Sequence, residues 1–435
     1  MKKIVIALCI FIASANISDA QQSNTEAADF DGSGRVDFPD FLIFAGGFGK
    51  STSDIGFDAR LDFSGNGTVD FPDFLVFAQA FGTSPNDPQN VLLYIADVTG
   101  SRVEVLDIAT NLLDPSRALI VDQPRGVALS TSQVYVAAID TFYAFDKNSG
   151  AATFAIPLDP IISTSGGRES RGGFRVVLSK DQNTAFVTEE GIGWVEVFDL
   201  NAKTSTTHIP VSNSPSGITI SPDGSRIYVA HGLGAQDISV IDTQNHTVLE
   251  TIPVGAAVTR FAMSADGNKL YLNNTEGNVV QVLNTQNKTI ENSLQVGQTG
   301  DLLTRVYDVA LSPDGSRLFA AVWRFLTGFD TTGAPVNISW GGIVVIDTQT
   351  FTQVAEIQAG ELVANMGVTP DGKTAYVAGV ESLDDQATGN LQVFIIDLEN
   401  NQSLGTIRGL SLPVAFAFNA SKPAIPQLPQ ISFSF

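Results

Sequence analysis

The residues Ser221-Pro-Asp-Gly-Ser-Arg-Ile-Tyr-Val-Ala230, followed by Val240-Ile-Asp-Thr-Gln-Asn245, show the pattern that decides the fold. A Pro-Asp-Gly turn leads into a strand that contains an aromatic residue, and a β-branched strand ending in aspartate comes next. Short alternating runs with turn residues between them are typical of antiparallel β-structure. The glycine stands where a hairpin needs a positive φ.

From Val91 onward this pattern recurs seven times. The residues that end the third strand of each unit, called marker residues below, are Asp107, Asp146, Asp199, Asp242, Asn284, Asp347 and Asp397. Four-stranded units repeating at roughly 40 to 50 residues are β-propeller blades, because each sheet buries its faces only against its neighbours. The first unit lacks its first strand, which is found at Pro413–Asn419. We predict a mainly β fold, a seven-bladed β-propeller over residues 91–419 in which the two ends share a blade and leave no open sheet edge.

Two copies of one acidic phrase precede the repeats, at Asp29–Asp40 and Asp62–Asp73. Ca²⁺ takes roughly six to eight oxygen ligands, which an EF-hand loop supplies from alternate positions and from its last residue. The first set would be Asp29, Asp31, Ser33, the Arg35 carbonyl, Asp37 and Asp40. The second would be Asp62, Ser64, Asn66, the Thr68 carbonyl, Asp70 and Asp73. The sequence therefore predicts two Ca²⁺ sites, and aspartate in the last position favours the weaker binding that suits extracellular calcium.

Apolar runs follow each acidic phrase. Phe41–Phe48 and Phe74–Phe81 are expected to form short helices, with a proline tolerated in the first turn of each. Val36 and Val69 are expected to pair the two loops as a short β-bridge. The expected N-terminal part is a small α-helical, EF-hand-like calcium module over residues 29–84.

The paired loops resemble the dockerin module of secreted and cellulosome proteins. That resemblance implies a cohesin-like partner, although Phe38-Pro39 and Phe71-Pro72 stand where dockerins carry small polar residues. The repeats resemble the YVTN family of seven-bladed propellers, which is grouped with lactonase-like propellers; Tyr228-Val-Ala and Val240–Asn245 match its phrase best. The YVTN resemblance implies a fold more than a function, since the family includes surface-layer, binding and enzymatic members.

The first twenty residues indicate a secreted protein. Residues 1–20 combine two lysines, an apolar stretch and a small-x-small cleavage site, which is typical of a signal peptide. The only cysteine, Cys9, lies in this segment, so the expected mature chain has no disulfide. The net charge of −22 disfavours nucleic acid and anionic lipid as partners. We expect an extracellular, cell-surface or periplasmic protein with no membrane span, with linkers at 21–28 and 85–90 and a tail at 420–435.

The first strands of the blades should line the central channel. Four of their residues, Arg175, Arg260, Asp308 and Asn365, are polar and are expected at the channel mouth. They could form simple ion pairs between Asp308 and either arginine, or they could recognise a carboxylate or a sugar. Longer connections at about 158–171, 323–342 and 381–390 should emerge on the same face, which makes it the expected working surface.

Other candidate residues remain open between two interpretations. Trp323 and Trp340 could stack on a sugar or a partner's side chain, or could fix a long loop to its own scaffold. Glu189 and Glu190 could be acid, base or metal ligands, or could lie in a solvated loop. The three histidines are not expected to converge.

The leading hypothesis is a secreted calcium-binding protein with a propeller that binds or scaffolds a protein or carbohydrate partner. No Gly-x-Ser-x-Gly, His-Glu-x-x-His or phosphate-binding glycine loop occurs, so no catalytic residue is assigned. The alternative is a lactonase-like or polysaccharide-active hydrolase that uses Glu189, Glu190, Asp308 and Asn365. A purely structural surface-layer or adhesion role is a third hypothesis.

Overall fold

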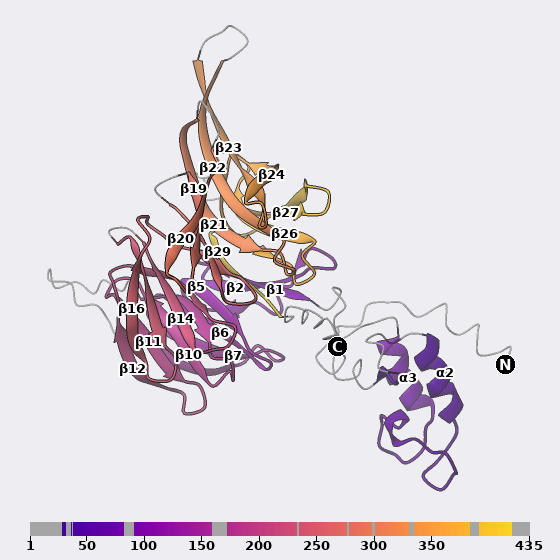
Figure 1. Ribbon diagram of the computed structural model, residues 1–435. Coiled ribbons are helices and arrows are strands. Elements are labelled where there is room, and N and C mark those ends of the chain that lie inside the picture. The colour runs from indigo at the N-terminus through magenta and orange to yellow at the C-terminus, as the bar shows by residue number, and fades with distance from the viewer. Residues whose placement is uncertain are drawn as a thin grey trace, which may run out of the picture. The chain divides into compact units, whose positions relative to one another are not determined.

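The computed structural model describes residues 28–31, 36, 38–81, 91–158, 172–232, 235–275, 278–297, 301–329, 335–382 and 391–419. The chain divides into two compact units, Met1–Asn90 and Val91–Phe435 (Figure 1). The predicted signal peptide and tail, the proposed ligands Ser33, Arg35 and Asp37, and most of two long connections lie outside the described residues. No helix among the described residues is long and apolar enough to cross a membrane.

Seven antiparallel sheets form the larger unit, which confirms the predicted seven-bladed propeller. The innermost strands are β29 (Pro413–Phe418), β5 (Pro124–Leu129), β9 (Gly173–Leu178), β13 (Pro215–Ile220), β17 (Phe261–Met263), β21 (Asp301–Leu311) and β25 (Leu362–Val368). The second strands are β1 (Leu92–Asp97), β6 (Gln133–Ala138), β10 (Thr184–Glu189), β14 (Arg226–His231), β18 (Lys269–Asn273), β22 (Arg317–Phe329) and β26 (Thr374–Val380).

The outer half of each blade follows the same order. The third strands are β2 (Arg102–Asp107), β7 (Thr141–Asp146), β11 (Trp194–Asp199), β15 (Asp237–Asp242), β19 (Val279–Asn284), β23 (Pro335–Asp347) and β27 (Gln392–Asp397). The outermost strands are β3 (Leu112–Leu113), β4 (Leu119–Ile120), β8 (Ala152–Pro157), β12 (Thr204–Pro210), β16 (Thr247–Pro253), β20 (Thr289–Gln295), β24 (Thr352–Gly360) and β28 (Gln402–Ile407). Blade 1 is β29-β1-β2 with β3 and β4, and blades 2 to 7 follow in chain order.

The ring closes where β29 pairs with β1, as predicted from the displaced first strand. Asp97, which is 1% exposed at the end of β1, accepts hydrogen bonds from the backbone N–H groups of Ser411 (2.9 Å) and Leu412 (2.6 Å). At the other end, the Leu92 N–H donates to Asn419 Oδ1 at 2.8 Å. Apolar side chains pack between neighbouring blades all around the ring, and the cluster of Leu93, Tyr376 and Ile395 seals blade 7 against blade 1.

All seven marker residues end a third strand, and each fixes the turn that follows. Asp242, for example, accepts backbone hydrogen bonds from Gln244 (2.9 Å) and Asn245 (2.8 Å). The residue four positions after each marker has a left-handed backbone; these are Asn111, Gly150, Lys203, His246, Lys288, Phe351 and Asn401. This local hydrogen-bonded turn is the physical reason for the repeated aspartate.

Acid should weaken the Ser221-Pro-Asp-Gly224 turn. The Ser221 hydroxyl and the Ser225 backbone and hydroxyl groups donate to Asp223 and lower its pKa to about 2. A carboxyl group whose pKa is lower in the folded state than in the unfolded state stabilises the fold at pH values above its unfolded-state pKa. This stabilisation is lost as the pH falls toward about 2. We expect the difference in unfolding free energy between wild type and Asp223→Asn to narrow between about pH 4 and pH 2. Urea titrations at each pH measure it, and a constant difference would contradict the expectation.

Among its described residues, the smaller unit contains the helices α2 (Phe38–Gly47) and α3 (Phe71–Ala80) and a 3₁₀ turn at Ala59–Leu61. The helices begin three residues earlier than predicted, and Phe44 and Phe77 stack in the core with ring centroids 5.0 Å apart. The predicted Val36–Val69 bridge is wrong. Ser51 bridges Thr68 instead, and Val36 and Val69 are both buried in the same core.

Blade 6 differs from the sequence-based expectation of a long loop at 323–342. Strands β22 and β23 continue as a paired hairpin as far as Phe329 and Pro335, and Figure 1 shows it projecting beyond the other blades. The extra residues thus lengthen two strands.

Candidate functional site

In the second acidic loop, two carboxylates accept hydrogen bonds from the backbone of the loop. The Asp62 carboxylate accepts hydrogen bonds from the backbone N–H groups of Asn66 (3.2 Å) and Gly67 (2.8 Å). Asp73, which is fully buried, accepts from the N–H groups of Ser64 (2.7 Å) and Asp70 (2.8 Å). The first and last carboxylates of the loop therefore hold its backbone in a tight arc.

Two observations bear on whether this loop fits a cation. Asp70 Oδ1 is buried and has no hydrogen-bond partner in the described part of the chain. Burial raises the pKa of the Asp73 carboxyl, but the donated hydrogen bonds from Asp70 and Ser64 outweigh burial and leave the pKa below its ordinary value. Carboxylate oxygens are the ligand type that a hard cation takes, but Asp62, Asp70 and Asp73 are not among the groups of described residues whose ligand atoms lie within 4.8 Å of one another. Calcium binding by this loop therefore stays a prediction.

The first loop repeats part of this arrangement. Asp29, Asp31 and Asp40 each bring a carboxylate oxygen within 4.8 Å of the others, one of two groups among the described residues that could hold a metal ion. Asp40 is buried and accepts from the N–H groups of Phe30 (2.7 Å) and Asp31 (3.1 Å), as Asp73 does in the second loop.

The channel residues come together, but not as ion pairs. Arg175 and Arg260 both donate to the amide oxygen Asn365 Oδ1, at 3.5 and 3.2 Å. Asp308, which is 8% exposed, instead accepts from the N–H groups of Val309 (2.8 Å) and Met366 (3.0 Å). The expected ion pair between Asp308 and an arginine is not among the ion pairs of the described residues. Asp308 acts on both arginines only as a nearby charge.

A phenylalanine that the sequence did not single out organises this cluster. The guanidinium carbons of Arg125, Arg175 and Arg260 lie 5.9, 4.9 and 5.4 Å from the centre of the Phe174 ring. Burial is the main cause that lowers the pKa of Arg175, and the neighbouring Arg260 lowers it further, whereas Asp308 acts in the opposite direction.

The two tryptophans of the blade 6 hairpin face different ways. Trp340 lies opposite Arg324 in the register, and the Arg324 guanidinium stacks 3.8 Å above the Trp340 ring while it pairs with Glu356 at 2.6 Å. Trp323 Nε1 donates to Ser339 Oγ at 2.7 Å. Both rings are therefore held by the blade itself, and their ligand-binding role stays a prediction.

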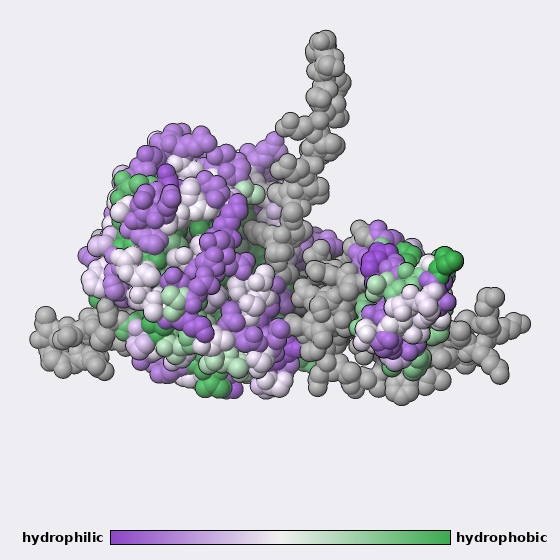
Figure 2. Space-filling model, turned by 90° about the horizontal axis from the view of Figure 1, so that it is seen from below, coloured by the Kyte–Doolittle hydropathy of each residue, from purple (hydrophilic) through white to green (hydrophobic). Residues whose placement is uncertain are grey.

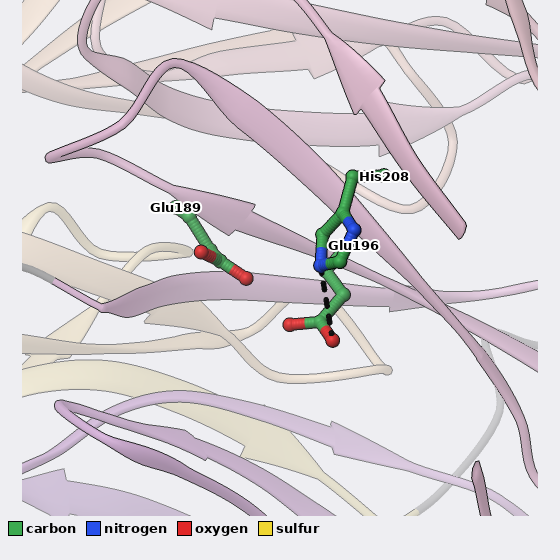
Figure 3. A group of neighbouring side chains, drawn as sticks. All are labelled: Glu189, Glu196 and His208. Atoms are coloured by element: carbon green, nitrogen blue, oxygen red, sulfur yellow. Dashed lines mark ion pairs between the residues drawn. The ribbon is translucent and has the colours of Figure 1, made fainter. Parts of the chain in front are cut away.

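Glu189, Glu196 and His208 form the second group that could hold a metal ion (Figure 3). The sequence singled out Glu189 but grouped it with Glu190, and it missed Glu196 and treated His208 as isolated. Glu190 acts electrostatically on Arg175 and Arg260, whereas Glu189 belongs to this other group. The hydrolase constellation of Glu189, Glu190, Asp308 and Asn365 is thus divided between two places.

Comparison with known proteins supports the fold. No family model matches the chain. The chain is 27% identical over 204 residues to antigen Lp49 of Leptospira interrogans, and this alignment covers 43% of this chain and 43% of the antigen. It is 26% identical over 310 residues to the seven-bladed β-propeller protein Rv1057 of Mycobacterium tuberculosis, which covers 64% of this chain and 73% of that protein. The chain thus spans less than half the length of the first relative.

Among solved structures, hydrazine synthase of Kuenenia stuttgartiensis superimposes with a TM-score of 0.51 at 19% identity, over 63% of this chain and 77% of that chain. This likeness shows the fold alone. The matches give no support to the EF-hand and dockerin resemblance, which stays a prediction. The chain is a seven-bladed β-propeller protein that is distantly related to Rv1057 and Lp49.

Proposed function

We propose that this chain is a secreted calcium-binding protein whose propeller binds a partner through carboxylate groups. The partner is a protein or carbohydrate that carries acidic groups. The observation that carries the proposal is the cluster of Arg125, Arg175 and Arg260 around Phe174. In a chain with a net charge of −22, a group of three half-buried arginines at the channel is a local concentration of positive charge.

Guanidinium groups recognise carboxylates by paired, charge-assisted hydrogen bonds. In the described residues, Arg175 and Arg260 share one neutral amide oxygen, and neither forms an ion pair with a carboxylate. A carboxylate brought by a partner would supply the missing charge in a site of low dielectric, where such pairs are strongest. Asp308 is held by backbone amides and so acts in this proposal as an anchor between β21 and β25.

The smaller unit would hold calcium and present a second surface. The loop residues at Asp29–Asp40 and Asp62–Asp73 would each hold one Ca²⁺, which would stabilise the helix that follows. Phe38, Leu42, Phe71 and Leu75 are exposed at matching positions of α2 and α3. Figure 2 shows hydrophobic residues among hydrophilic ones on the visible surface of this unit. These apolar positions favour a protein partner for the helices, in place of the polar contact expected of a dockerin.

The arginine cluster can be tested with oligogalacturonate and an acidic peptide as probes and neutral galactan as the comparison. Arg260→Gln is the variant of choice, because Arg260 makes fewer backbone contacts than Arg175. We expect the wild type to bind at least one acidic probe in preference to galactan, and Arg260→Gln to weaken that binding by about 10- to 100-fold, as loss of a charged hydrogen bond predicts.

Arg226→Gln is the matched control, since Arg226 is a half-exposed arginine already paired with Asp242 at 3.3 Å. It should bind like the wild type. Equal binding of acidic and neutral probes, or equal loss in both arginine variants, would overturn the proposal for the propeller and leave the calcium loops to be judged separately.

A further inference from the structure

Three neighbouring strands of blade 3 bring Glu189, Glu196 and His208 onto one face of the sheet. Glu189 ends β10, Glu196 lies on β11, and His208 lies opposite Glu196 on β12. Figure 3 shows the three side chains directed toward one another, and one ligand atom of each lies within 4.8 Å of the other two. Glu189 is 1% exposed and Glu196 is 2% exposed, so both carboxylates are out of water.

In blade 1, an arginine neutralises the acidic residue at the corresponding position of the third strand. Its corresponding residues are Asp97 at the end of the second strand and Glu104 on the third, and Arg102 opposite Asp97 forms an ion pair with Glu104 at 3.2 Å. In blade 3 the residue in the place of Arg102 is Trp194, opposite Glu189. The arginine that neutralises blade 1 is thus replaced by an uncharged side chain.

Blade 4 gives a second comparison. There the second strand ends in His231, whose ring lies 2.9 Å from Ser239 Oγ and 3.9 Å from Asp237 Oδ1, a set that carries one acidic group. Blade 3 instead places two carboxylates with one imidazole. The combination of two acids and one histidine is therefore particular to this blade among the three.

Glu196 is incompletely satisfied within the described part of the chain. Its Oε1 faces His208 Nε2 at 3.5 Å, which is long for a hydrogen bond, and its buried Oε2 has no hydrogen-bond partner there. The Trp194 ring packs against the imidazole with centroids 4.9 Å apart, which holds Nε2 toward the carboxylates. A buried carboxylate oxygen without a donor costs free energy, and a bound cation is one way to offset that cost.

We propose that Glu189, Glu196 and His208 bind a divalent transition-metal ion of the Zn²⁺ class. Imidazole nitrogen and carboxylate oxygen are both zinc ligands, and zinc sites with an open position take three protein ligands, whereas Ca²⁺ takes oxygen ligands. The ion offsets the charge of two buried carboxylates, and the half-buried His208 leaves one side open for water or a ligand group. This site is independent of the calcium loops and of the arginine cluster.

The test is a Zn²⁺ titration of the full chain by calorimetry, in excess Ca²⁺ so that the acidic loops are not the variable. We expect the wild type to bind one more Zn²⁺ than Glu196→Gln or His208→Gln does. Glu104→Gln is the matched control, because it removes a buried glutamate from the corresponding position in blade 1, and it should keep the wild-type stoichiometry. Co²⁺ in place of Zn²⁺ should give visible absorption bands that His208→Gln loses.

Thermal melting separates a metal site from a structural ion pair. With Zn²⁺ removed by a zinc-selective chelator, Glu196→Gln should melt at or above the wild-type Tm, since it removes a charge from a buried acidic group. With Zn²⁺ present it should melt below the wild type. Equal Zn²⁺ stoichiometry in all four proteins, or a lower Tm of Glu196→Gln under both conditions, would overturn the proposal. If Glu196→Gln does not fold, the partly exposed His208→Gln decides the stoichiometry and the absorption spectrum.

Discussion

Replacing Asp97 with alanine should lower the free energy of unfolding of the propeller by about 3 kcal/mol or more. The carboxylate accepts from the backbone N–H groups of Ser411 and Leu412, which lead into β29, and from that of Gly100. Each buried donor left without an acceptor costs about 1 to 3 kcal/mol. The loss falls at the one place where opposite ends of the propeller sequence meet. Urea denaturation followed by tryptophan fluorescence measures it.

Asp97→Asn is the control, because its amide oxygen can still accept from part of the set. It should lose clearly less stability than the alanine variant. A stability of Asp97→Ala equal to that of the wild type would show that the closing strand is held by its β-pairing alone and that this carboxylate has no part in it.

Under the proposed function, replacing Asp73 with alanine should reduce the number of Ca²⁺ ions that the full chain binds from two to one. Asp73 is the last residue of the second loop, is buried, and is fixed by the N–H groups of Ser64 and Asp70. A carboxylate in this position closes the coordination of an EF-hand loop, so its loss should weaken calcium binding at that loop beyond detection while the first loop still binds. Calorimetric titration with Ca²⁺ gives the stoichiometry directly.

Asp54→Ala is the matched comparison in the same unit. Asp54 is an exposed aspartate outside both acidic phrases that accepts from Ser51. It should leave two ions bound, and Asp40→Ala should lose the ion of the first loop only. No calcium uptake by the wild type at millimolar concentration would refute the calcium part of the proposed function.

The propeller could be predicted from the sequence because its signals are local. Each marker residue fixes a turn within three residues of itself, and Asp242 with Gln244 and Asn245 shows the contact that makes aspartate recur. The displaced strand Pro413–Phe418 could be recognised because every other unit shows what was missing. Counting back along the first strands also placed Arg175, Arg260 and Asn365 together, because innermost strands all face one axis.

The blade 6 hairpin could not be predicted from alternation. Gly341 and Gly342 interrupt β23, and glycine in a strand weakens the pattern on which the interpretation depends. The sequence alone predicts that Arg324 is an exposed loop residue. In the structure its guanidinium is buried between the Trp340 ring and Glu356. Arg324 is buried because the pairing of β22 with β23 and of β23 with β24 brings Trp340 and Glu356 next to it.

The metal-site residues were missed because a β-bulge decides their register. The pairing of β11 with β12 shifts between Val197 and Phe198, and this shift places His208 opposite Glu196. Without the extra residue, His208 would lie opposite Val195 and point to the other face, since a slip of one residue reverses every side chain. The sequence does not mark the bulge.

The junction between β1 and β29 also determines when the propeller can close during synthesis of the chain. Blades 2 to 7 contain strands that follow one another along the chain, so each can assemble as the ribosome delivers it. The first blade cannot be completed, and the inner edge of β1 stays unpaired, until the residues through Phe418 have been synthesised. The ring therefore closes only after β29 has been synthesised, and until then β1 carries an unpaired edge that could pair with another chain.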